Sequence, residues 1–222
     1  MTGWDWQSWR TVADLPKRDL MLRDTLTTLA NKHLSDKGTT FAQAHAYTIV
    51  YDELLGPLRD SEITLLEIGL RHDPYYGDAN HATSPSLSMW MEFFPKARIF
   101  AVDWNDFTPL TAGRVRVFQG DQGDPGFLRS LVSELPDLDI VIDDGSHASL
   151  HQQVSFKHLF PRLKPGGFYF IEDVHWQPPW EQSLPPVPLT SDLFKSPAMQ
   201  CLLDVSFHVS EKLCCVRKKN AS

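Results

Sequence analysis

Two acidic segments contain the residue types that could carry out chemistry. Asp143, Asp144 and His147 lie close together in the chain, and Glu172 is followed directly by Asp173. If both segments reach the same place, their carboxylates repel one another unless a cation compensates the charge. Mg²⁺ suits such oxygen ligands, and a bound metal lowers the pKa of a hydroxyl group. Because an imidazole accepts protons near neutral pH, the two segments predict metal-assisted removal of a hydroxyl proton, with His147 as the base.

The same residues also fit a structural role. Asp143 and Asp144 could cap the helix that follows, because carboxylates accept hydrogen bonds from the free N–H groups of a first helical turn. His147 would then lie in that first turn. The sequence by itself leaves this alternative open.

Both acidic segments follow apolar runs of the length of a buried strand. Five such runs alternate with helical segments, which predicts a mostly parallel sheet covered by helices on both faces. Because ligands of such sheets bind beyond the carboxyl ends of the strands, the acidic segments are expected to share one rim. The expected strands are 63–69, 97–103, 115–120, 138–143 and 167–172, and the expected helices include 87–94, 127–135 and 152–163.

The C-terminal part of the chain has a different pattern. Residues 204–209 and 213–217 form two short runs joined by a polar turn, which predicts a β-hairpin. A parallel sheet closed by an antiparallel hairpin separates class I methyltransferases from ordinary dinucleotide-binding domains. The expected fold class is therefore α/β and Rossmann-like, with seven strands in a single domain over residues 1–222. The first 60 residues are expected to be helical, apart from a polar loop at 35–40.

Polar residues at the ends of the expected strands indicate a site for S-adenosylmethionine (SAM). Glu67 and Gly69 end the first strand, where a longer loop over 71–83 replaces the usual Gly-x-Gly turn. Asp103 ends the second strand, where a carboxylate accepts hydrogen bonds from ribose hydroxyls, although a solvated strand-end carboxylate is the alternative. Asp121 and Gln122 follow the third strand and could read an adenine edge, although they also suit a turn.

Ser86 opens the helix after this loop. It is expected to contact the cofactor, and it is also a suitable N-cap for the helix. The two roles are compatible.

The composition excludes several other classes of protein. Hydrophobic residues make up 42% of the chain and charged residues 22%, as in ordinary globular proteins. The net charge of −7, without a long basic run, disfavours nucleic acid and anionic membranes as partners. We find neither a signal peptide nor an apolar run of about 20 residues, so the expected location is the cytoplasm. The three cysteines, two of them adjacent, fit neither a disulfide framework nor a zinc site.

Several motifs together resemble the metal-dependent sugar O-methyltransferases of macrolide and related antibiotic biosynthesis. The resemblance covers roughly residues 31–217. Its motifs are Ser35 to Thr39, His45-x-Tyr47, Val50-Tyr51, Leu66 to Gly69, Ser86-Leu87-x-Met89-Trp90, Phe94-Pro95-x-Ala97, Val141 to His147, Leu163 to Gly167 and Ile171 to Asp173.

The resemblance implies a metal centre. Asp144, Glu172 and Asp173 match the magnesium ligands of the family, and His147 matches its general base. Asp144 and His147 are therefore the expected catalytic pair.

The resemblance also implies contacts with SAM. Asp103, Asp143 and the turn from Glu67 to Gly69 match the cofactor contacts of the family. The loop that contains Lys37 and Thr39 matches an element that closes over the cofactor.

The acceptor is less defined than the cofactor. The stretch 177–197 is rich in proline and is expected to form a lid over a small-molecule acceptor. A sugar hydroxyl, a phenol, a hydroxamate and a carboxylate are all compatible with the sequence, and a homo-oligomer stays open. The competing hypothesis is a protein of the same fold that binds SAM without transferring its methyl group, or that uses SAM for another reaction.

Overall fold

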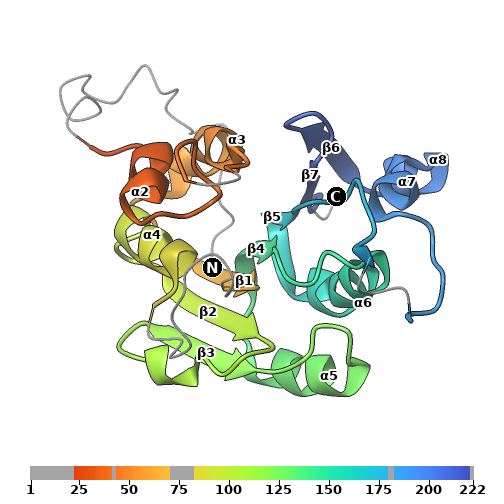
Figure 1. Ribbon diagram of the computed structural model, residues 1–222, viewed down its shortest axis with the longest axis horizontal. Coiled ribbons are helices and arrows are strands. Elements are labelled where there is room, and N and C mark those ends of the chain that lie inside the picture. The colour runs from red at the N-terminus through yellow and green to blue at the C-terminus, as the bar shows by residue number, and fades with distance from the viewer. Residues whose placement is uncertain (1–22, 42–43, 71–82, 180–182, 221–222) are drawn as a thin grey trace.

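The centre of the molecule is a seven-stranded sheet in the order β3-β2-β1-β4-β5-β7-β6 (Figure 1). The computed structural model describes residues 23–41, 44–70, 83–179 and 183–220. Strands β1 to β5 pair in parallel, and β7 pairs antiparallel with both β5 and β6. The predicted mostly parallel sheet with an antiparallel C-terminal hairpin is thereby confirmed. The strands are β1 (Thr64–Ile68), β2 (Arg98–Asp103), β3 (Val115–Gln119), β4 (Leu138–Asp143), β5 (Leu163–Ile171), β6 (Asp204–His208) and β7 (Leu213–Arg217).

Helices cover the sheet on both faces, as the alternating pattern predicts. The helices on one face are α2 (Leu26–Lys32), α3 (Tyr47–Leu55) and α4 (Pro85–Phe93). Those on the other face are α5 (Pro125–Glu134), α6 (Ser149–Leu159), α7 (Thr190–Lys195) and α8 (Pro197–Leu202). Short 3₁₀ turns lie at η3 (Gly56–Leu58), η5 (Thr108–Leu110) and η6 (Phe160–Arg162). No helix in the described ranges has the length and apolar character needed to cross a membrane.

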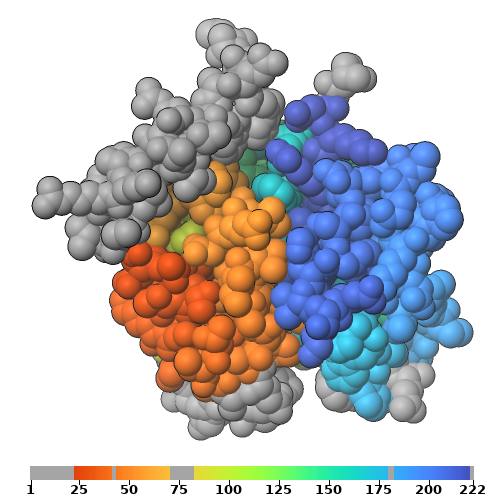
Figure 2. Space-filling model, turned by 90° about the horizontal axis from the view of Figure 1, so that it is seen from above, coloured from red at the N-terminus to blue at the C-terminus, as the bar shows by residue number. Residues whose placement is uncertain are grey.

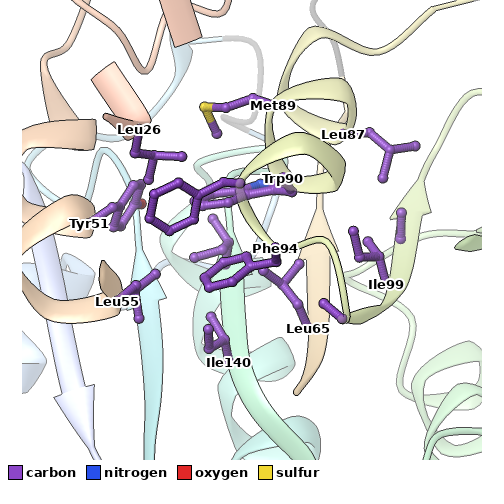
Figure 3. Close-up of a cluster of buried hydrophobic side chains, with 14 of the residues drawn as sticks. Leu26, Tyr51, Leu55, Leu65, Leu87, Met89, Trp90, Phe94, Ile99 and Ile140 are labelled. Carbon is purple, nitrogen blue, oxygen red and sulfur yellow. The ribbon is translucent and has the colours of Figure 1, made fainter. Parts of the chain in front are cut away.

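Two separate hydrophobic cores result from the alternation of side chains along each strand. Leu65 packs into the core under α2, α3 and α4, whereas its neighbour Leu66 packs into the core under α5 and α6. In the first core the Trp90 ring lies 5.6 Å from that of Tyr51 and 6.1 Å from that of Phe94 (Figure 3). This packing attaches the N-terminal helices to the sheet.

The element boundaries follow the sequence closely, with one exception. The helix expected over 152–163 ends earlier than predicted: α6 ends at Leu159, and η6 follows it. Pro161 lies in η6 and has no N–H group to continue the helical ladder. Strand β5 consequently begins at Leu163, several residues before the expected start.

Part of the expected N-terminal segment lies outside the described residues. Residues 1–22 and most of the loop 71–83 belong to the portion that the structure does not describe, as do residues 180–182 of the expected lid. Within the described part, the polar loop expected at 35–40 does connect α2 with α3. The three cysteines are free thiols, as expected.

The strand order determines where a ligand can bind. Strand β1 lies between β2 and β4, so the chain connections leave it in opposite directions. In open α/β sheets this switch point leaves a crevice at the carboxyl ends of the strands. In Figure 2, α2 and α3 (red to orange) lie beside the C-terminal part of the chain (blue).

Candidate active site

A cavity of about 840 Å³ lies at the carboxyl ends of the strands. Its walls come from the loop between α2 and α3, from the ends of β1, β2, β3 and β4, and from the segments after β5 and β6. The structure thus brings together most of the residues that the sequence singles out. Those that line the cavity are Lys37, Gly69, Ser86, Asp103, Asp121, Gln122, Asp144, His147 and Asp173.

Four predicted site residues do not line this cavity. Glu67, Asp143 and Glu172 are buried behind its walls. Thr39 stays with α2, where its Oγ1 accepts a hydrogen bond from Asn31 at 3.0 Å. The side chains of these four residues contact other protein groups rather than the cavity.

The turn after β1 takes the tight path that glycine permits. Gly69 has φ +84°, and a Cβ added there would lie 1.9 Å from the carbonyl oxygen of Asp144. The next residue, Leu70, donates its N–H to Asp103 Oδ2 at 2.7 Å. A single glycine therefore lets β1 turn against the acidic segment after β4, although the second glycine of the usual motif is absent from the sequence.

Replacing Gly69 with alanine is expected to lower the melting temperature by roughly 6–12 °C, because strained backbone and a steric overlap combine there. Gly113 is the matched control, since its φ is also positive (+55°) but an added Cβ meets nothing within 4 Å. Comparing the thermal unfolding of Gly69→Ala with that of Gly113→Ala separates the cost of the steric overlap from the cost of the strained backbone. Equal losses of stability in G69A and G113A would contradict the close approach of Gly69 to Asp144.

The N-cap of α4 is Ser84, so the prediction of Ser86 as the cap is wrong. Ser84 Oγ accepts the N–H of Leu87 at 3.3 Å. Ser86 instead donates its hydroxyl to Glu67 Oε2 at 3.0 Å, and Trp90 donates its ring N–H to the other oxygen of Glu67 at 3.0 Å. Burial raises the pKa of Glu67 to about 7. Glu67 therefore joins the end of β1 to α4 beneath the cavity.

The polar residues at the ends of β2 and β3 are already hydrogen-bonded to the protein, and Gln122 is the most fully occupied of them. Asp103 Oδ1 accepts the N–H of Asn105 at 2.8 Å, and Asp121 Oδ1 accepts that of Gly123 at 2.7 Å. Gln122 is occupied by the protein itself, because its Nε2 donates to Asp143 at 3.0 Å and its Oε1 accepts the N–H of Ser146 at 2.6 Å.

Asp143 is fully buried under this wall of the cavity. Burial raises its pKa to about 6, while the hydrogen bond from Gln122 and the one from the backbone of Gly145 act in the opposite direction. Its contacts position the loops after β3 and β4 against each other.

The acidic ends of β4 and β5 meet, as the sequence predicts. Tyr47 donates its hydroxyl to Asp173 Oδ1 at 2.7 Å, and Tyr51 donates to Glu172 Oε1 at 2.6 Å. The ammonium group of Lys37 forms ion pairs with Asp144 Oδ2 and, at 2.9 Å, with Glu172 Oε1. Helix α3 and the loop before it therefore hold all three carboxylates.

The burial of these carboxylates is costly. Burial raises the pKa of Glu172 well above its usual value, and the charge of Asp144 raises it further, while Lys37 opposes both effects. Burial likewise raises the pKa of Asp144, against the opposing charge of Lys37. An excess of negative charge at one rim attracts a cation.

Asp144, His147 and Asp173 form a group suited to a metal ion. Each offers one donor atom to the cavity, and these atoms lie within 4.8 Å of one another. Within the described ranges, the buried Nδ1 of His147 has no hydrogen-bond partner. Carboxylate and imidazole donors are common ligands of divalent ions, so these residues fit a metal by both composition and spacing.

The helix-capping alternative is wrong. Helix α6 begins at Ser149, its N-cap is Ala148, and no side chain caps it. His147 precedes the helix with φ +59°, and Asp173 has φ +53°. Left-handed backbone at non-glycine residues is costly, and strained residues of this kind cluster at active sites.

Sequence reasoning missed several residues of the cavity wall. His175 lies in a turn just after β5 and lines the cavity, with its Nδ1 3.9 Å from Asp173 Oδ1. His45 Nδ1 lies 3.8 Å from the same oxygen. His175 could have been predicted, because it follows the end of β5 closely in the sequence. No local signal in the sequence places His151 or Lys212 in this wall.

No protein-family model matches the chain, but curated proteins do. The chain is 41% identical over 148 residues to the 8-demethyl-8-(2-methoxy-alpha-L-rhamnosyl)-tetracenomycin-C 3'-O-methyltransferase of Streptomyces olivaceus, covering 66% of this chain and 36% of that protein. It is 37% identical over 158 residues to the mycinamicin VI 2''-O-methyltransferase of Micromonospora griseorubida, covering 70% of this chain and 37% of that protein. The chain thus spans little more than a third of the length of these relatives.

Solved structures agree with the sequence matches. The methyltransferase MycE of the mycinamycin biosynthetic pathway, in complex with Mg and SAH, has a TM-score of 0.71 and 29% identity, covering 90% of this chain and 56% of that one. An O-methyltransferase family protein from Burkholderia thailandensis, 13% identical with a TM-score of 0.50, shares the fold. The fold is that of the class I methyltransferases.

Proposed function

This chain is homologous to the sugar O-methyltransferases of antibiotic biosynthesis, and from that premise we propose that it transfers the methyl group of SAM to a hydroxyl of a small natural product. We propose a hydroxyl on a sugar as the acceptor, since the name of the tetracenomycin-C relative specifies a rhamnosyl compound and 3'-O-methylation. The proposal includes Mg²⁺ as a cofactor and the cytoplasm as the location.

The observation that carries the proposal is the group formed by Asp144, His147 and Asp173 at the edge of the cavity. The donor atoms of these residues lie within 4.8 Å of one another. A protein that only bound SAM would have no need for a metal group and an imidazole beside the cofactor pocket. Their presence therefore favours transfer over binding alone.

The cavity has the size and polarity of a cofactor pocket. Small-ligand sites usually enclose about 300–1,000 Å³, and this cavity encloses about 840 Å³. We propose that Asp103 accepts hydrogen bonds from the ribose of SAM, with Gly69 beneath it and Asp121 toward the adenine. Glu67 and Asp143 support these walls from behind, through the hydrogen bonds to Ser86 and from Gln122 described above.

The proposed chemistry needs alignment and removal of one proton. When bound, SAM would supply a methyl group already activated on a sulfonium, and Mg²⁺ would lower the pKa of the acceptor hydroxyl. Asp144 and Asp173 would hold the metal at the cavity. Glu172, buried behind them against Lys37 and Tyr51, would add negative charge to the centre. His147 stays off the metal in this proposal, because an imidazole nitrogen that binds a metal has no lone pair for a proton. It would accept the hydroxyl proton as the C–O bond forms and the C–S bond breaks, with the sulfur leaving in line as a neutral thioether.

The segment after β5 provides the remaining wall. His175, Trp176 and Leu184 line the cavity on this side. Gln177 accepts the N–H of Ser149 at 3.0 Å, which fastens the start of the expected lid to α6. We propose that the described part of the segment 177–197 encloses the acceptor, with Trp176 stacking on it.

Two measurements test the function. Calorimetric titration is expected to show that the wild type binds SAM. The Asp103→Ala variant is expected to have an affinity for SAM that is lower by about 10-fold or more, because a charged acceptor of hydrogen bonds is removed. Incubation with SAM, Mg²⁺ and a panel of glycosylated polyketides is expected to add about 14 Da to at least one of them, by replacement of a hydroxyl hydrogen with methyl. Absence of SAM binding would contradict the proposal as a whole, whereas binding without any mass shift across the panel would favour the binding-only alternative.

A further inference from the structure

Lys37 lies inside the carboxylate centre at the wall of the cavity. Its side chain is 1% exposed. Its Nζ pairs with Asp144 Oδ2 and lies 2.9 Å from Glu172 Oε1. The same Glu172 oxygen accepts the hydroxyl of Tyr51 at 2.6 Å. The ammonium group is therefore enclosed by two acidic side chains that the sequence assigns to the metal.

Backbone hydrogen bonds fix the loop around Lys37, and so position its side chain in the centre. Thr48 donates its N–H to the carbonyl of Lys37 at 3.0 Å, and Ala46 donates to that of Gly38 at 2.8 Å. His45 donates its N–H to the carbonyl of Asp36 at 2.7 Å. These bonds tie the loop to the start of α3.

The contacts of Lys37 divide the centre into an inner and an outer part. Lys37 occupies the inner oxygen of Asp144, Oδ2, and one oxygen of Glu172. The outer part is the group of Asp144, His147 and Asp173, whose donor atoms face the cavity. An ammonium group has no lone pair and cannot coordinate a metal. Beside a bound Mg²⁺, it can act only as a like charge.

We propose that Lys37 is a positioning residue that serves as a permanent internal counter-cation: it stabilises the carboxylates without metal and weakens their affinity for Mg²⁺. The inference rests on the proposed function, because it takes the two carboxylates of the outer group, Asp144 and Asp173, as the metal ligands. A purely structural Lys37 predicts the opposite sign, since its loss would disorder the ligands and weaken metal binding. The direction of the change in affinity therefore decides between the two roles.

The test measures Mg²⁺ affinity by calorimetry on the full chain. Lys37→Met removes the charge and keeps the length of the side chain, and Mg²⁺ is expected to bind about tenfold more tightly because a repulsion between close cations is removed. Lys37→Arg keeps the charge and is expected to stay within about threefold of the wild type. Lys164→Met is the matched control, because Lys164 pairs with Asp139 at 2.7 Å outside the cavity.

Thermal unfolding in EDTA gives a second readout that does not depend on activity. Loss of the internal cation leaves buried carboxylates unpaired, so K37M is expected to melt roughly 6 °C or more below the wild type. K164M, which loses a partly exposed pair, is expected to change by less than about 3 °C. If K37M does not fold in EDTA, Lys37→Gln retains a hydrogen-bond donor and gives the same comparison.

The outcomes separate the inference from the proposed function. If the wild type binds Mg²⁺ and K37M binds it equally or more weakly, Lys37 is a structural residue and the inference fails alone. If neither the wild type nor K37M binds Mg²⁺, the proposed metal centre fails and the inference fails with it. Tighter binding by K37M, with unchanged binding by K164M, supports both.

Discussion

Replacing His147 with alanine is expected to lower kcat by about 10²- to 10⁴-fold, the usual contribution of a general base. His147 lies at the cavity wall beside Asp144, with 4.0 Å between His147 Nδ1 and Asp144 Oδ1. Without the imidazole, the acceptor hydroxyl has to release its proton to water. The affinity for SAM is expected to stay within about threefold of the wild type, since a transition-state interaction is lost rather than a ground-state one. Single-turnover kinetics and calorimetry measure the two quantities.

The conformation of His147 calls for a second variant. Its φ of +59° is left-handed, which asparagine tolerates better than alanine does. His147→Asn therefore preserves the turn while removing the base, and it should show the same loss of kcat. His158→Ala is the control, because His158 hydrogen-bonds Val154 on α6 away from the cavity. A kcat within about threefold of the wild type in both His147 variants would remove this residue from the base role.

The second large effect is expected for Asp173→Asn. An asparagine can still accept the hydroxyl of Tyr47, which lies 2.7 Å from Asp173 Oδ1, but it carries no charge. Loss of one anionic ligand is expected to weaken Mg²⁺ binding and to lower kcat by about 10²-fold or more, because a metal contributes several kcal/mol to stabilisation of the developing charge. The wild type in EDTA should show a similar loss, which added Mg²⁺ reverses.

The control for Asp173→Asn uses the same substitution elsewhere. Asp124 is the N-cap of α5, where its side chain accepts the N–H of Gly126. Asparagine caps helices as well as aspartate does, so Asp124→Asn should leave both stability and Mg²⁺ affinity unchanged. Full activity of Asp173→Asn in EDTA would show that the reaction needs no metal at this centre.

The sequence by itself determined the sheet and the rim at which the site lies. Buried parallel strands must be apolar, so the runs 97–103 and 138–143 can be recognised in the sequence. These two runs end on the polar residues Asp103 and Asp143. Once the strands are parallel, their carboxyl ends meet at one edge whatever the loops do. Asp144 and Asp173 therefore reach the same cavity wall, as predicted.

Only the tertiary structure decided how the charges at that rim are arranged. Lys37 meets Asp144 and Glu172 across 107 and 135 residues of chain, a pairing that depends on the path of the loop between α2 and α3 and that leaves no periodic pattern in the sequence. The same is true of His45 beside Asp173. Apolar periodicity reflects the secondary structure of each segment alone, whereas an ion pair depends on two distant backbones being in place at once. The meeting of the acids at this rim could therefore be predicted from the sequence, and the cation behind them could not.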